Sequence, residues 1–151
     1  MRTYQMGERA TAGHLIYTAL ETEWLPQVGE GAEQRLPKNR FFLVKISITN
    51  SGSSDQIAPT LILMDDNGNS YPELTDGQGV RQWIGAIRKI KPAEAAQGNL
   101  VFDVAPRHYR LRIADEDDQQ PALIDIPLSF GTELPNSTGA LPDGKAATDK
   151  K

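Results

Sequence analysis

The sequence predicts an all-β fold, an antiparallel sandwich or barrel of about seven or eight short strands. Three observations lead to this prediction. Segments rich in β-branched and aromatic residues recur at roughly 8–12-residue spacing, with turn residues between them. Several of these segments alternate apolar and polar residues, as strands with one buried face do. The 151 residues also include 13 Gly and 10 Pro, which favours many tight turns over long helices.

The first part of the chain contains two expected strands and a loop. Residues 3–12 are polar and alternate weakly, so an edge strand is expected there. Residues 14–24 are rich in β-branched and aromatic side chains and form a strand that stops before Pro26. Trp24, near the end of that strand, is expected in the core or at the end of the sandwich. The charged, glycine-bearing residues 28–39 are expected as a solvated loop.

The clearest strand covers residues 41–50, where apolar side chains occupy one face and polar ones, such as Lys45, occupy the other. An apolar run over residues 57–64 follows and leads into a polar turn. In that turn Asn67-Gly68 predicts a hairpin, because both central positions of a type I′ turn need positive φ.

After an irregular stretch over residues 72–85, four short segments complete the expected strands. They are residues 87–90, 98–104, 109–113 and 122–128. The alternation in these and the earlier strands predicts a core made of Leu15 or Ile16, Tyr17, Phe42, Val44, Ile46, Ile48, Leu61, Leu63, Leu100, Phe102, Val104, Leu111, Ile113, Ile124 and Ile126.

Length and composition limit the organisation and the class of protein. A chain of 151 residues is one domain, expected over residues 1–130. Residues 131–151 have almost no large apolar side chain, so a disordered Pro-, Gly- and polar-rich tail is expected there. Sixteen Lys and Arg against 20 Asp and Glu give a net charge of −4, which argues against nucleic-acid binding and docking on anionic lipid.

The residues themselves do not determine the cellular compartment of the protein. The chain has no Cys, which removes disulfides, thiolate metal sites and a Cys nucleophile. No stretch approaches the roughly 18–20 apolar residues of a transmembrane helix. Residues 1–8 lack the apolar region of a signal peptide, so a cytoplasmic protein and a trimmed ectodomain are both compatible with the sequence.

Four groups of segments carry a resemblance to a known family. They are residues 6–8 followed by 15–18, residues 41–52, residues 63–71, and Ile90-Lys91-Pro92 leading into residues 98–104. In this order, over about residues 6–130, the chain resembles a bacterial immunoglobulin-like β-sandwich domain family of unknown function, similar in fold to a secreted mycobacterial immunoprotective antigen. The resemblance implies a single antiparallel immunoglobulin-like β-sandwich. It also implies a secreted or envelope-anchored location, and it carries over no catalytic residues.

Neither catalytic nor metal-binding residues are predicted. Residues 65–69 offer several oxygen ligands, but an EF-hand needs Gly at the sixth position and Glu at the twelfth, which here are Ser70 and Asp76. The acidic run 115–118 is expected to lie in solvent. His14 and His108 lack partners at zinc-ligand spacing, and no nucleophile elbow is present. We therefore expect a non-enzyme without a cofactor.

The candidate binding residues are Arg81, Trp83 and Arg88. They lie in the apolar and basic segment 79–89 of an otherwise acidic chain. Loops of a sandwich commonly carry recognition, and Trp and Arg dominate interface hot spots. Two alternatives stay open for Trp83: it contacts a partner, or it folds inward and caps the core.

The function predicted from these observations is that of a non-catalytic, envelope-exposed or secreted module that binds a protein or another surface component. Two alternatives remain beside it. The first is an interaction domain of a larger membrane-anchored protein. The second is a hydrolase that uses a carboxylate pair such as Asp65 and Asp66.

Overall fold

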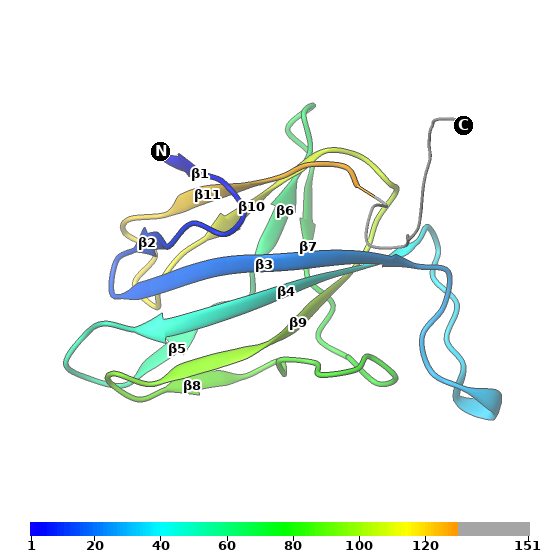
Figure 1. The fold of residues 1–151 in the computed structure, drawn as a ribbon, viewed down its shortest axis with the longest axis horizontal. Coiled ribbons are helices and arrows are strands. Elements are labelled where there is room, and N and C mark those ends of the chain that lie inside the picture. Colours follow the sequence, from blue (N-terminus) through cyan, green and yellow to red (C-terminus); the bar gives the residue numbers. More distant parts are fainter. Residues whose placement is uncertain (130–151) are drawn as a thin grey trace.

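The structure is a computed structural model that describes residues 1–129. The tail expected at residues 131–151 lies outside the described residues. Two main sheets face each other as a sandwich (Figure 1). One sheet has the order β1 (Thr3–Tyr4), β11 (Ala122–Ile126), β10 (Tyr109–Ile113), β6 (Ile62–Met64) and β7 (Ser70–Pro72). The other has the order β2 (Ala10–Ala12), β3 (Leu15–Leu25), β4 (Phe41–Asn50) and β9 (Ala95–Asp103).

The smaller elements complete the architecture. Strands β5 (Gln56–Ala58) and β8 (Arg88–Ile90) form a separate antiparallel pair, and a 3-10 turn, η1, covers Gly31–Glu33. Every pairing of named strands is antiparallel except that of β1 with β11, which is parallel. The predicted all-β sandwich is confirmed. Within residues 1–129 no helix has the length and apolar character needed to cross a membrane.

Two expected strands are each divided between sheets. Residues 3–12 form β1 and β2, which lie in opposite sheets, and the turn between them includes Gly7 at a φ of +86°. The run expected at residues 57–64 is interrupted after Ala58, so β5 pairs with β8 while β6 joins the five-stranded sheet. Pro59 lies at this break and has no N–H to donate to a ladder.

The core between the two sheets is confirmed residue by residue. Every residue of the predicted core is buried, and of the pair left open it is Leu15, not Ile16, that faces inward. Trp24 is also buried, and its ring stacks on Phe42 with centroids 4.1 Å apart. Tyr109 packs against the same ring at 6.3 Å. The inner rows of β3, β4 and β10 therefore meet in one continuous apolar layer.

A second, smaller apolar cluster lies on the outer face of the four-stranded sheet. It contains Phe41, Leu43 and Val101 from the strands, with Val28 and Val80 from the loops that cover them. Lys45 lies on this outer face, as expected, and Leu43, on the same face, is almost completely buried. As a result β4 is covered on both faces along its first half.

The hairpin predicted at Asn67-Gly68 is confirmed, but its turn type is different. Strands β6 and β7 pair across residues 65–69, with the Asp65 N–H donating to the Asn69 carbonyl at 3.0 Å. Gly68 has a φ of +85°, whereas Asn67 is not among the described residues with positive φ. The Asp65 carboxylate accepts the N–H groups of Asn67 and Asn69, each at 2.9 Å, and this holds a longer turn.

Candidate functional site

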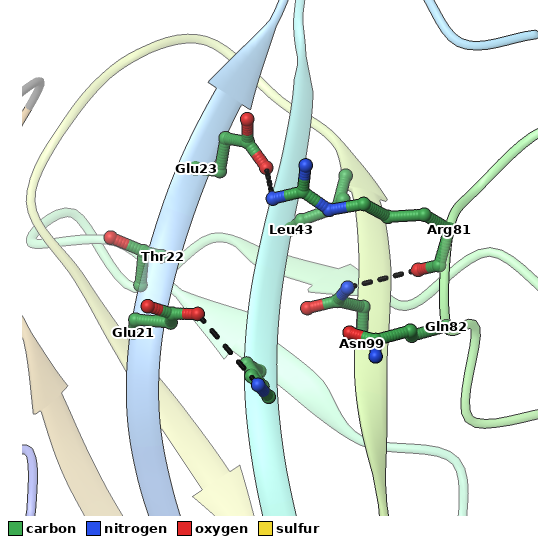
Figure 2. A pocket seen from close by; sticks show the side chains of 8 residues that line it. Glu21, Thr22, Glu23, Leu43, Arg81, Gln82 and Asn99 are labelled. Atoms are coloured by element: carbon green, nitrogen blue, oxygen red, sulfur yellow. Dashed lines mark hydrogen bonds and ion pairs between the residues drawn. The ribbon is translucent and has the colours of Figure 1, made fainter. Parts of the chain in front are cut away.

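A hollow of about 240 Å³ lies on the outer face of the four-stranded sheet, beside the segment 79–84 (Figure 2). A second hollow of about 320 Å³ adjoins it and shares Lys45 and Gln82 with it. We call the two hollows together the outer groove. The first is lined by Glu21, Thr22, Glu23, Leu43, Lys45, Arg81, Gln82 and Asn99, and the second by Lys45, Gln82, Trp83, Gln97 and Gly98.

A β-bulge in β3 brings two carboxylates into the outer groove. Residues 15, 17 and 19 point into the core, but the register with β4 shifts between Ala19 and Glu21, leaving Leu20 as the extra residue. Beyond the bulge the even-numbered Trp24 points inward, so Glu21 and Glu23 point outward. They face Lys45 and Leu43 of β4, respectively, across the ladder.

The segment beside the groove is held along β9 by main-chain hydrogen bonds. The Asn99 N–H donates to the Gln82 carbonyl at 2.7 Å, and the Ile84 N–H donates to the Asn99 carbonyl at 3.0 Å. The Asn99 side-chain amide also donates to the Arg81 carbonyl at 2.9 Å. Gly98 permits this approach, since a Cβ there would lie 2.6 Å from the Gln82 carbonyl oxygen.

The charges in the groove are paired. Arg81 contacts the Glu23 carboxylate at 2.7 Å, and Lys45 lies 3.9 Å from the Glu21 carboxylate (Figure 2). Asn99 is only 6% exposed, and its Oδ1 atom has no hydrogen-bond partner among the described residues. Figure 2 shows that this oxygen is turned away from Arg81, toward β4. The groove therefore presents donors and acceptors side by side, with no excess of either charge.

Trp83 is half-buried, and it packs on the outer apolar cluster and not in the core of the sandwich. A Cβ at Gly77 would lie 2.0 Å from the Trp83 ring, so the indole covers that glycine closely. Trp83 also lines the second hollow of the groove. Trp83 therefore folds inward, as one alternative expects, but onto the outer apolar cluster. It also borders a hollow, as the other alternative, contact with a partner, requires. A role in contacting a partner stays a prediction.

Arg88 is a buried residue, which corrects the expectation that it contributes to an exposed binding surface. Its side chain is 1% exposed and forms two parallel hydrogen bonds with the Glu73 carboxylate, at 2.9 and 2.8 Å. It also donates to the carbonyls of Gly85 and Pro59. Arg88 lies in the expected strand 87–90, and its basic side chain carries no sequence signal for burial. The acidic partner, Glu73, lies 15 residues away, in the irregular stretch 72–85.

Carboxylates of the two acidic turns also accept hydrogen bonds within the protein. Asp65 accepts hydrogen bonds from Asn69, Tyr71 and backbone N–H groups, and these lower the pKa of its carboxyl to about 2. Asp115 is buried and accepts the His14 N–H at 3.0 Å, which corrects the expectation that the whole run 115–118 lies in solvent. Over residues 1–129 no group of three or more His, Asp or Glu side chains is placed to hold a metal ion.

His108 connects two carboxylates on the outer face of the five-stranded sheet. Its Nδ1 lies 2.9 Å from Asp66 and its Nε2 lies 2.6 Å from Asp125. Hydrogen bonds to Asp125, and then to Asp66, raise the pKa of the imidazole above its ordinary value. No sequence pattern indicates this arrangement, because the three residues come from separate segments of the chain.

A family model for a domain of unknown function, DUF4352, matches residues 4–118. The chain belongs to the DUF4352 family. This membership agrees with the resemblance to a family of unknown function. No curated protein matches the DUF4352 chain at a significant level.

Solved structures similar to this DUF4352 domain are β-sandwich proteins. The yjhA protein from Bacillus subtilis has a TM-score of 0.64 at 17% identity, over 82% of this chain and 98% of that one. The secreted protein MPT63 from Mycobacterium tuberculosis has a TM-score of 0.56 at 14% identity, over 82% and 96%. The lipoprotein candidate ycdA from Bacillus subtilis has a TM-score of 0.58 at 12% identity, over 80% of this chain and 38% of that one. These identities establish the shared fold alone.

Proposed function

We propose that this DUF4352 domain is a non-catalytic recognition module that acts outside the cytoplasm and binds a component of the cell envelope through the outer groove. The observation that carries the proposal is the buried Asn99, whose free Oδ1 is turned toward β4 on the floor of a hollow flanked by two ion pairs. An acceptor that no protein group satisfies is available to water or to a ligand. Such polar groups fix the orientation of a ligand in a pocket.

A location outside the cytoplasm is supported by the similar structures. One is described as a secreted protein and another as a lipoprotein candidate. The outer groove is built from the four-stranded sheet and one loop segment. Binding residues concentrate on loops that a rigid scaffold positions.

The non-catalytic assignment is supported by how the candidate acids and bases are used. The groove carboxylates Glu21 and Glu23 are each in an ion pair, with Lys45 and Arg81 respectively. Asp65, one member of the carboxylate pair considered for a hydrolase, has its oxygens engaged by hydrogen bonds within its own hairpin and with Arg107.

The test measures binding of the full chain to envelopes isolated from the organism that encodes it. We expect the chain to sediment with the envelopes, and Arg81→Ala to weaken this binding at least tenfold. Arg110→Ala is the matched control, because Arg110 is a half-buried arginine in an ion pair with Asp66 on the other sheet. Absence of sedimentation, or equal loss in the two variants, contradicts the proposal.

A further inference from the structure

We infer that the ligand of the outer groove is an uncharged oligosaccharide. This inference rests on the proposed function and names the ligand class for the same site. It draws on three features of the groove: the balance of its charges, the free acceptor on its floor, and the aromatic residue beside its second hollow.

The first feature is that the groove has many hydrogen-bonding groups but no net charge. Glu21 and Glu23 supply carboxylate acceptors, and Lys45 and Arg81 supply donors, in two pairs of opposite charge. A ligand with a net charge would be attracted by one member of each pair and repelled by the other, so the pairs give it little Coulombic gain. A sugar hydroxyl both donates and accepts, so it can bond to a carboxylate on one side and a cationic group on the other without a change in charge.

The second feature is the row of side chains across the three central strands. Glu21 is opposite Lys45 in the β3–β4 ladder, and Lys45 is opposite Asn99 in the β4–β9 ladder. The row therefore runs from carboxylate to ammonium to amide. The Asn99 Oδ1 is held in place because the amide nitrogen of the same side chain donates to the Arg81 carbonyl. It is an acceptor fixed before any ligand binds, which suits a ligand hydroxyl.

The third feature is Trp83, beside the second hollow. Its indole is fixed by packing on Gly77 and the outer apolar cluster, and Trp83 borders the hollow together with Gln82 and Gln97. The C–H face of a sugar ring is apolar, whereas its edge carries the hydroxyls. An aromatic surface beside amide groups therefore matches both parts of a sugar. Because Lys45 and Gln82 border both hollows, the two hollows adjoin, and linked sugar units could occupy both.

The experiment uses the full chain and the envelope-sedimentation assay. Envelopes are digested with protease, and glycan-cleaving enzymes then release oligosaccharides that anion exchange separates into neutral and charged fractions. We expect protease digestion to change binding less than twofold, and the neutral fraction to compete with the envelopes. In NMR spectra, the neutral fraction should shift the side-chain signals of Asn99 and Trp83.

The groove is tested with Lys45→Met, which keeps an apolar stem but cannot donate a hydrogen bond. We expect at least a tenfold weaker response to the neutral fraction. Lys89→Met is the matched control, because Lys89 is an exposed lysine 3.5 Å from Asp55 and lines neither hollow. Loss of envelope binding on protease digestion, competition by the charged fraction alone, or equal effects of the two variants overturns the oligosaccharide inference. The first two results leave envelope recognition standing, whereas absence of envelope binding refutes the proposed function itself.

Discussion

Removal of one partner from the buried ion pair between Glu73 and Arg88 is expected to destabilise the protein strongly. Both side chains are at most 2% exposed, and the carboxylate also accepts the Leu61 N–H at 2.7 Å. In Glu73→Ala the guanidinium and the Leu61 N–H are left without this carboxylate in the interior. Breaking a buried pair in this way costs about 3–5 kcal/mol. This is a large share of the roughly 5–15 kcal/mol by which a domain is stable.

The assay is chemical denaturation of the wild type, Glu73→Ala, Arg88→Met and the double variant Glu73→Leu/Arg88→Met. Each single change should lower the free energy of unfolding by several kcal/mol. The double change should recover most of the loss, because neither buried charge then lacks its partner. A cost below about 1 kcal/mol for Glu73→Ala would refute the reasoning, since such a value is typical of an exposed pair. A double variant that is as unstable as the sum of the two singles would refute it as well.

Three further predictions concern other parts of the structure. Gly98→Ala should lower the free energy of unfolding by about 1–3 kcal/mol, because the new Cβ meets the Gln82 carbonyl oxygen, and denaturant melts check this. An NMR titration should find the pKa of His108 above its ordinary value, and this pKa should be lower in Asp125→Asn. Because the pKa is raised in the folded state, protonated His108 stabilises the fold fully below about pH 6.5. This contribution to the free energy of unfolding is lost as the pH rises through the folded-state pKa. The pH dependence from Asp65 has the opposite sign: its lowered pKa stabilises the protein above about pH 4. Acid titration should show this contribution to the free energy of unfolding disappearing as the pH falls toward about 2. An ordinary pKa for Asp65 would contradict the hairpin geometry.

The fold was predictable because its main strands follow simple alternation. The inward rows of β4, β9 and β10 were placed correctly, since burial of one face imposes a period of two. The alternation of apolar and polar residues does not predict burial where both faces of a strand are covered. The burial of Leu43 and Val101 was therefore not predicted. Loops from other parts of the chain cover them, and a local pattern carries no information about such loops.

The candidate site was predictable only in part. Arg81 and Trp83 were identified from the composition of their segment, and they line the groove. Glu21 and Glu23 were missed although a signal exists: the inward residues change from odd to even positions between Ala19 and Trp24, which indicates a bulge. Asn99 and the burial of Arg88 depend on partners distant in the sequence, and one sequence does not specify those pairings.

The position of β4 has a consequence for how the groove responds to a ligand. β4 pairs with β3 and β9 along nearly its whole length, and its first half is covered on both faces. Amides in such a strand open only with the whole domain, so their hydrogen exchange should be among the slowest in the molecule. Because Lys45 projects from this strand, the floor of the groove has little conformational freedom to lose when a ligand arrives. Association should then resemble the docking of two preformed surfaces, with backbone displacements of less than about 1 Å.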